Sequence, residues 1–264
     1  MPDGVSCLGE DGGMRGIQLG MIGWVVSMAA AAENAYVETR VVSSSYATQA
    51  AAVDGRFIYA VASREVAKID RADGKELAVS EGKASHLNSA FIQDGKIHCA
   101  HSNFPLKPEK GQIMVLDPDT MKLAVFHGFS DPPGSLTWAL EKDGNWWCHF
   151  AHYGTDNGRS VLVRYDGGWK EMGRWTYPPE FVAEWGKMSL SGAVWQDGEI
   201  LATGHDKKRI YRLRVPAAGR VVEWVATHES PFPGQGIAVD PETGGLVGID
   251  RKRKAVVFAE ARKP

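Results

Sequence analysis

The feature that most constrains the fold of this chain is an internal repeat of β-hairpins. Asp-Gly between two apolar runs is the strongest short-range signal for such a hairpin. Four segments align with one another, and each has an apolar run, a turn with glycine and a second apolar run: QAAAVDGRFIYAVAS (49–63), NSAFIQDGKIHCAHS (88–102), SLTWALEKDGNWWCHFAHY (135–153) and SLSGAVWQDGEILATGHD (189–206). A looser fifth copy is GQGIAVDPETGGLVGID (234–250).

A second pair of apolar runs follows each of the first four hairpins, as in GQIMVLDPDTMKLAVF (111–126). The repeating unit is therefore four antiparallel strands. Its turn glycines recur every 40 to 54 residues, at Gly55, Gly95, Gly144, Gly198 and Gly245. This period suits one blade of a β-propeller. We predict an all-β fold, a five-bladed β-propeller of four-stranded antiparallel blades. The alternative is an open β-sandwich, which does not require so regular a period.

The N-terminal strand is expected to complete the last blade. The fifth unit has no fourth strand after AVVFAEA (255–261), and YVETRVVS (36–43) alternates as a strand does. Pairing the two segments would close the ring and remove exposed sheet edges. Residues 36–264 are thus predicted to form a single propeller domain.

Residues 1–35 are predicted to be a leader with an export signal. Met14-Arg15 precedes an apolar run from Ile17 to Ala32, and Ala30 and Ala32 suit an A-x-A cleavage site. A membrane anchor is the alternative, but the 16 apolar residues are fewer than the roughly 20 that a spanning helix needs. We expect a periplasmic or secreted protein, a monomer without a stable membrane anchor.

Net charge and cysteine positions indicate which partners and which cross-links to expect. The net charge is −2 with both signs interspersed, so no field would gather a polyanion and no nucleic acid is expected as a partner. A small molecule or an oligosaccharide is expected instead. Cys99 and Cys148 lie on equivalent strands of neighbouring repeats, beyond the roughly 7 Å Cα separation of a disulfide, and are predicted to be buried free thiols.

Four histidines and a glutamine fall at one face of the predicted ring. If the Asp-Gly turns lie at one face, first strands begin and second strands end at the other, which we call the mouth. His86 precedes a first strand, and Gln235 begins the last one. His101, His152 and His205 end second strands at matching places in three successive blades. The insertions 102–111, 153–159 and 177–188 fall there too, and such loops usually hold functional residues.

Several imidazoles near one point favour a divalent transition metal such as manganese, zinc, iron or nickel. A metal held by them would polarise a substrate carboxylate or carbonyl, while His152, His205 or Tyr153 acts in catalysis by moving a proton. The alternative is that these histidines bond to backbone groups and line a polar channel. The remaining histidines do not share this register and are expected to be structural or surface residues: His98, His127, His149 and His228.

Other polar side chains near the mouth are candidates for substrate binding. Asparagine and hydroxyl groups suit hydroxyl-rich ligands, and an arginine can hold a carboxylate with two hydrogen bonds. The candidates are Asn88, Asn103, Thr137, Asp206 and Arg251. Tryptophans of the repeats are expected to pack inside blades, with stacking on sugars as the alternative: Trp138, Trp146, Trp147 and Trp195. The motifs of serine hydrolases and zincins do not occur.

Four blocks carry a family resemblance: HLNSAFIQDGKIHCAHSNFP, GSLTWALEKDGNWWCHFAHYG, SGAVWQDGEILATGHD and GQGIAVD. From about Ala50 to Phe258 the chain resembles exported bacterial β-propeller proteins labelled cycloisomerase-like. It is also similar to propeller lyases of uronate sugars or cyclic lactones, in which channel histidines and a glutamine bind a metal. The chain departs from the seven-bladed examples in blade number. The resemblance implies the metal ligands His86, His101, His152, His205 and Gln235.

Three functions remain open at this stage. The first is an exported lyase or cycloisomerase that acts on a carboxylate-bearing carbohydrate or related small molecule and uses a histidine-bound metal. The second is a glycoside or lactone hydrolase at the same mouth, with Asp206 or Asp250 as general base. The third is a propeller that binds a ligand without catalysis.

Overall fold

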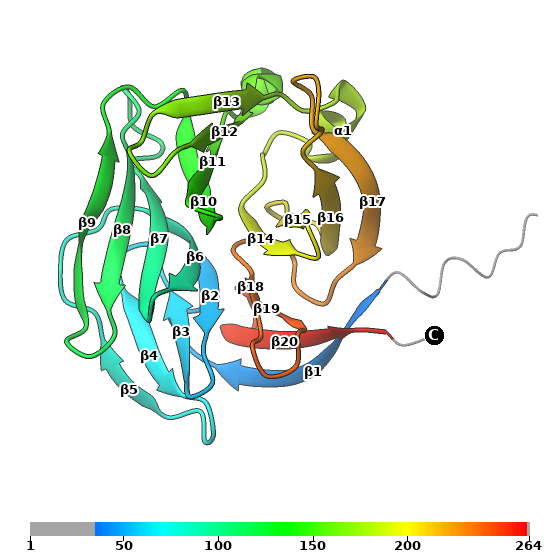
Figure 1. Ribbon diagram of the computed structural model, residues 1–264. Helices are drawn as coiled ribbons and strands as arrows, with labels where there is room; N and C mark the ends of the chain where they lie inside the picture. The colour runs from blue at the N-terminus through cyan, green and yellow to red at the C-terminus, as the bar shows by residue number, and fades with distance from the viewer. Residues whose placement is uncertain (1–34, 263–264) are drawn as a thin grey trace, which may run out of the picture. The chain divides into compact units, whose positions relative to one another are not determined.

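Five four-stranded antiparallel sheets surround a common axis in the structure, a computed structural model that describes residues 35–262. Figure 1 shows the first strand of each blade nearest the axis and the later strands farther out. The prediction of a five-bladed, all-β propeller is confirmed. The hairpin repeat thus corresponds to the two inner strands of each blade.

The elements follow one another blade by blade. Blade 1 contains β2 (Ala50–Val53), β3 (Phe57–Val61), β4 (Val66–Asp70) and β5 (Glu76–Val79). Blade 2 contains β6 (Leu87–Gln93), β7 (Lys96–Ser102), β8 (Gly111–Asp117) and β9 (Lys122–Phe129). Blade 3 contains β10 (Ser135–Lys142), β11 (Asn145–Ala151), β12 (Val161–Tyr165) and β13 (Glu171–Trp175). Blade 4 contains β14 (Gly192–Gln196), β15 (Glu199–Thr203), β16 (Arg209–Arg214) and β17 (Glu223–Glu229). Blade 5 contains β18 (Ala238–Val239), β19 (Leu246–Asp250), β20 (Ala255–Ala261) and β1 (Tyr36–Ser43). Two short helices lie in connections: the 3-10 helix η2 (Gly154–Arg159) and α1 (Pro179–Glu184).

Turn chemistry explains why the hairpins form. In blades 2, 3 and 4 both tip residues have positive φ, for example 49° at Asp94 and 72° at Gly95. Such backbone conformations match the twist of the flanking strands and favour Asp-Gly. The fifth turn differs from the expected one, because the positive φ of 73° belongs to Gly244 and not to Gly245. At Gly245 a Cβ would lie 2.5 Å from the carbonyl oxygen of Ala259, so glycine is needed there for close approach of the strands.

Blade 5 takes its outermost strand from the N-terminal part of the chain. Strand β1 pairs antiparallel with β20, with Val42 opposite Val256. At the boundary between blades 5 and 1, the buried guanidinium of Arg71 lies 2.8 Å from the carboxylate of Asp240. This ion pair and the strand pairing connect the two ends of the propeller sequence.

The inner strands approach one another so closely near the mouth that backbone fills the axis. A Cβ on Gly236 would lie 2.4 Å from the Cβ of Ala50 and 2.9 Å from the Cα of Ser89. A Cβ on Gly192 would lie 2.5 Å from the Cα of Gly236. Strands β6 and β14 contact each other although their blades are not neighbours. The axis is therefore closed at this level.

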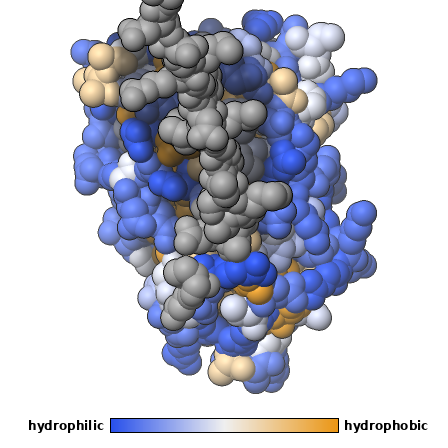
Figure 2. Space-filling view, turned by 90° about the vertical axis from the view of Figure 1, so that its right-hand side faces the viewer, coloured by the Kyte–Doolittle hydropathy of each residue, from blue (hydrophilic) through white to orange (hydrophobic). Residues whose placement is uncertain are grey.

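Between the blades, hydrophobic side chains form several separate clusters. The cysteines lie within two of them: Cys99 and Cys148 are buried and free, as predicted. On the face that Figure 2 shows, hydrophilic residues cover most of the described surface. Most of the large hydrophobic side chains of residues 35–262 are buried.

No helix among residues 35–262 is both long enough and apolar enough to cross a membrane. The predicted leader and export signal, residues 1–35, lies almost entirely outside the described residues.

Candidate functional site

Hydrogen bonds join successive blades at the mouth and involve several of the predicted site residues. Asn88 and Thr137, predicted to bind substrate, are buried, and each donates to a backbone carbonyl of the next blade. Their polar atoms therefore satisfy backbone groups where the blades meet. The bonds are Asn88 Nδ2 to Leu136 O at 2.9 Å, Thr137 Oγ1 to Leu190 O at 2.8 Å, Thr203 Oγ1 to Gln235 O, and Gly236 N to Gln49 O at 2.8 Å.

Asn103 holds the loop that follows β7 in shape. Its side-chain amide donates to the carbonyl of Pro108 at 2.9 Å, and its Oδ1 accepts the backbone N–H of Lys110 at 2.8 Å. Both polar atoms thus have partners within the 103–110 loop. The role of Asn103 in substrate binding stays a prediction.

The four candidate histidines lie at three places: His86 and His101 in blade 2, His205 where blades 4 and 5 meet, and His152 at a pocket between blades 2 and 3. In blade 2, the rings of His86 and His101 are near enough for the charge of His86 to lower the pKa of His101, after the larger effect of burial. Nε2 of His101 accepts the backbone N–H of Ser85 at 3.0 Å, which leaves its buried Nδ1 without a partner. Burial also lowers the pKa of His86, and a hydrogen bond with Asn88 opposes that shift.

The second of these places is where blades 4 and 5 meet. Nδ1 of His205 lies 2.7 Å from the Asp206 carboxylate, whose other oxygen accepts from Arg251 at 3.2 Å. The side-chain amide of Gln235 donates to the carbonyl of His205 at 3.1 Å. The structure thus brings together His205, Asp206, Arg251 and Gln235, all predicted site residues. Their polar groups bond to one another.

His152 and Tyr153 line a pocket of about 240 Å³ between blades 2 and 3. The 103–110 loop forms its other wall, with Phe104 4.7 Å from the Tyr153 ring between ring centroids. Lys107 and Glu109 form an ion pair on this wall. The sequence indicated the loop as an insertion at the mouth, but not which of its side chains face His152.

His149 lies away from this pocket, in the interior. It is fully buried, stacked on Trp138 with 5.4 Å between ring centroids, and bonded through Nδ1 to the hydroxyl of Tyr177 at 2.7 Å and through Nε2 to that of Ser189 at 3.0 Å. Burial lowers the pKa of His149 to about 3, so its ring is neutral at ordinary pH. These contacts agree with the structural role expected for it.

The residues present do not fit a shared metal ion. Within residues 35–262, no three histidine, cysteine or acidic side chains lie close enough to hold one. One ring nitrogen is engaged by a protein group in each of His101, His152 and His205. The metal expected from the sequence stays a prediction, and no chemical step is derived through it.

An axial cavity of about 470 Å³ opens at the face of the Asp-Gly turns, opposite the mouth. All five blades contribute, and most of the lining is apolar, including Phe91, Leu140, Val194 and Trp195. Sequence analysis did not find this cavity. A signal was present, because the first strands end in large apolar residues just before the turns.

Comparisons with known proteins bear on the fold alone. No family model matches the chain. No curated protein matches it either. Among solved structures, a glutaminyl cyclase from Myxococcus xanthus, itself a five-bladed propeller, has 10% sequence identity and a TM-score of 0.56, with 86% of this chain and 96% of that chain covered. A chain of the mitotic checkpoint complex has 9% identity and a TM-score of 0.47, with 86% and 95% covered.

These values set the limit of the comparisons. At 10% identity the first similarity shows a shared propeller fold, and the second is too weak to carry an argument. Neither supports the cycloisomerase-like label, which stays an expectation. Function has to be argued from the pockets.

Proposed function

We propose that this chain is an exported enzyme that moves protons on a carboxylate-bearing carbohydrate or related small molecule, as a lyase or cycloisomerase, at the pocket of His152 and Tyr153. The observation that carries the proposal is that a neutral imidazole and a protonated phenol line the same small pocket. A lyase needs one group that accepts a proton and another that donates one.

His152 is suited to act as the base. Its Nε2 lies 2.6 Å from the carbonyl oxygen of Pro133, so Nε2 carries the hydrogen and donates it. Nδ1 is then the nitrogen with the free lone pair. Burial lowers the pKa of His152, and the hydrogen bond to Pro133 opposes part of this shift. The ring is therefore neutral at pH 7 and able to accept a proton.

Gly134 is the reason why His152 can take this position. A Cβ on Gly134 would lie 3.2 Å from Nε2 of His152 and 2.8 Å from the carbonyl oxygen of Ala151. The backbone N–H of His152 also donates to Ser160 Oγ at 2.9 Å. His152 is thus held through both its imidazole ring and its backbone.

Tyr153 is suited to act as the acid. Burial raises the pKa of Tyr153 to about 12, and a hydrogen bond with Ser135 opposes part of the rise. The phenol keeps its proton at neutral pH and can donate it to a leaving oxygen. Lys107 lines the same pocket, where it pairs with Glu109, and a substrate carboxylate would take the place of Glu109 as its partner.

The proposed step is a β-elimination. Nδ1 of His152 takes the proton from the carbon next to the substrate carboxylate, and the electron pair of that C–H bond forms a C=C bond. The C–O bond at the next carbon breaks, and Tyr153 gives its proton to the departing oxygen. A proton then passes from the imidazolium to the phenolate, which restores both groups.

The test is a search for an unsaturated product. Oligomers of galacturonic, mannuronic and glucuronic acid are incubated with the protein, and ultraviolet absorption of the new conjugated double bond is followed. His152→Ala and Tyr153→Phe should each lower the rate by about 10²- to 10⁴-fold. The matched control is His127→Ala, on the outermost strand of blade 2, which should leave the rate unchanged.

The pH dependence gives a second readout that a merely structural role would not produce. Because the base must be neutral, the rate should fall as the pH drops through the pKa of His152, which lies below the ordinary value of 6.5. Absence of unsaturated product from all three uronates, or wild-type rates in both variants, would contradict the proposal.

Hydrolysis is a second candidate, favoured by the contacts of His205. A histidine oriented by a carboxylate 2.7 Å away can activate water through its other nitrogen. Asp206 also contacts Arg251, whereas Asp250 accepts the backbone N–H groups of Lys252 and Arg253 in the turn after β19. Of the two predicted bases, Asp206 is therefore the better placed. Activity lost in His205→Ala but kept in His152→Ala would favour this candidate.

A further inference from the structure

A second pocket, of about 560 Å³, lies between blades 3 and 4 on the side of the Asp-Gly turns. We call it the inter-blade cleft. Its walls come from the β10–β11 and β14–β15 turns, strands β12 and β13, and the loop 215–220. Nothing in the sequence analysis assigned a role to it. Its volume lies within the range of about 300–1,000 Å³ typical of small-ligand sites.

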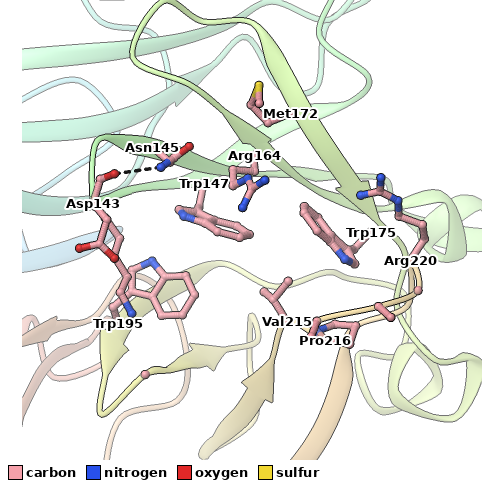
Figure 3. Close-up of a pocket in the computed structure, with 15 residues that line it drawn as sticks. Asp143, Asn145, Trp147, Arg164, Met172, Trp175, Trp195, Val215, Pro216 and Arg220 are labelled. Carbon is pink, nitrogen blue, oxygen red and sulfur yellow. Dashed lines mark hydrogen bonds between the residues drawn. The ribbon is translucent and has the colours of Figure 1, made fainter.

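Tryptophan side chains from three strands form the cleft's apolar surface. Figure 3 shows Trp147 and Trp175 side by side, with Trp195 below them. The ring centroids of Trp147 lie 5.6 Å from Trp175 and 5.4 Å from Trp195. The indole N–H groups of Trp175 and Trp195 are buried and have no hydrogen-bond partner. Buried N–H groups normally have partners, so two without one beside the same cleft are unusual.

Positive side chains lie against these indoles. The guanidinium carbon of Arg164 is 5.5 Å from the ring centre of Trp147 and 6.0 Å from that of Trp175. That of Arg220 is 5.2 Å from Trp175. Figure 3 shows Arg164 beside Trp147 and Arg220 on the outer side of Trp175. Such cation–π contacts hold the charges in place without neutralising them.

The cleft's positive charges lack carboxylate partners in the part of the chain that the structure describes. On the neighbouring strand, Arg174 pairs with Glu171 at 2.8 Å. Arg164, Arg220 and Lys142 have no comparable ion pair among residues 35–262, and Nε of Arg164 is buried without any partner. The lining contains one carboxylate, Asp143, against these three cations. The cleft therefore has an excess of positive charge.

The backbone is arranged to hold this geometry. At Gly173 a Cβ would lie 2.6 Å from the Trp175 ring and 2.8 Å from the guanidinium of Arg220, so glycine lets both side chains pack close to the backbone there. Thr176, which follows β13, accepts the backbone N–H of Val222 at 2.9 Å and donates its own to the carbonyl of Arg220 at 2.9 Å. These bonds fix the loop 215–220 of blade 4 to the edge of blade 3.

We infer that the inter-blade cleft binds an anionic sugar chain, in which pyranose rings lie on the indoles and a carboxylate is held by Arg164 and Arg220. An arginine forms paired hydrogen bonds with a carboxylate, and an indole offers a flat apolar face with one N–H donor. Polar side chains at the rim, Asp143 and Asn145, suit sugar hydroxyls. The inference does not rest on the catalytic role of His152, because the cleft and the mouth pocket share no residue.

The test uses the purified full chain and three probes of equal length. Trimers of galacturonic, mannuronic and glucuronic acid are titrated while tryptophan fluorescence and heat are measured, with the uncharged maltotriose as the matched probe. We expect saturable binding of at least one acidic trimer, an affinity for maltotriose at least tenfold weaker, and weaker acidic binding at 0.5 M salt than at 0.05 M salt, because added ions screen exposed charges.

Substitutions of the two arginines test whether the acidic trimers bind in the inter-blade cleft. Arg164→Met and Arg220→Met should each weaken binding of the acidic trimer at least tenfold, and Arg220 lies on an exposed loop whose change leaves the fold intact. The matched control is Arg56→Met, because Arg56 makes the same kind of contact with Phe57, 4.9 Å from its ring centre, outside the cleft. That variant should bind as the wild type does.

His152→Ala separates the two proposals. The variant protein should bind the acidic trimers as the wild type does, even if the substitution removes catalysis at the mouth pocket. Absence of saturable binding for all three trimers, equal affinity for maltotriose, or unchanged affinity in Arg220→Met would each overturn the inference, whether or not the mouth pocket proves catalytic.

Discussion

The mouth and the face of the Asp-Gly turns differ in whether their polar groups are available to a ligand. At the mouth, Asn88 and Thr137 bond to neighbouring blades, and backbone fills the axis at Gly236. At the opposite face, an apolar axial cavity opens, and the adjacent cleft holds Arg164 and Trp175 with unpartnered N–H groups. Most of the polar residues that the sequence places at the mouth therefore already have hydrogen-bond partners within the protein.

This difference teaches that a concentration of polar residues and a binding site are separate properties. Where blades meet, the backbone carbonyls at the ends of the inner strands are buried and need hydrogen-bond donors. Buried polar side chains of the neighbouring blade provide them. Among the predicted site residues, His152 and Tyr153 line a pocket at the mouth. The following predictions test whether the mouth is mainly structural.

The largest effect is expected from Gly236→Ala. The new methyl group would meet Ala50 and Ser89 at 2.4 and 2.9 Å, and neither neighbour can rotate away because the contacts are with a Cβ and a Cα. The free energy of unfolding should fall by about 3 kcal/mol in urea denaturation. Gly55→Ala, at the opposite face with open space around it, should change that energy by less than about 0.5 kcal/mol. Equal effects of the two changes would refute a closed axis at the mouth.

A smaller effect is expected from pH at His149. Its pKa of about 3 in the folded protein lies below 6.5 in the unfolded chain, so between these values only the unfolded chain binds the proton. Stability is therefore full above pH 6.5 and falls as the pH drops. Between pH 6.5 and 4.5 the wild type should lose about 2 kcal/mol more than His149→Gln, which does not titrate. Parallel curves for the two proteins in denaturation at each pH would contradict the buried neutral ring.

Thr137→Val tests a single bond between blades. It keeps the side-chain shape but leaves the buried carbonyl of Leu190 without its 2.8 Å partner. The expected cost is about 1–2 kcal/mol in the free energy of unfolding. Thr155→Val, at an exposed position in η2, is the matched control and should cost less than about 0.5 kcal/mol. If the two variants have the same stability, Thr137 has no role in joining blades 3 and 4.

The smallest effect is expected from a chelator. Because no three histidine, cysteine or acidic side chains among residues 35–262 lie close enough to hold a metal ion, EDTA should leave the melting temperature and any uronate activity unchanged. Bound transition metal in elemental analysis, together with a lower melting temperature after EDTA, would show that the imidazoles rearrange around a metal.

Local signals made the blades predictable. An Asp-Gly turn such as Asp94-Gly95 specifies its own hairpin through positive φ values, and the flanking residues alternate over a few positions only. The unpaired state of Cys99 and Cys148 also followed from their places in the repeat. The turn of blade 5 was shifted by one residue, because two adjacent glycines, Gly244 and Gly245, fit the pattern equally well.

The pockets were less accessible to sequence reasoning. The sequence predicted that four histidines lie near the ends of strands: His86, His101, His152 and His205. It did not predict their hydrogen-bond partners, which come from turns and loops. The inter-blade cleft joins Arg164 and Arg220 from outer parts of two blades.

Local sequence was enough to predict the number of blades and the order of their strands, and to place His101, His152 and His205 at or just after the ends of second strands, because turns and alternation act over a few residues. The tertiary structure decided how near the blades come to one another. That spacing closes the axis at Gly236 and leaves room between Trp147 and Trp195. Distances between blades depend on the packing of side chains from all five sheets at once, and no short stretch of sequence contains them.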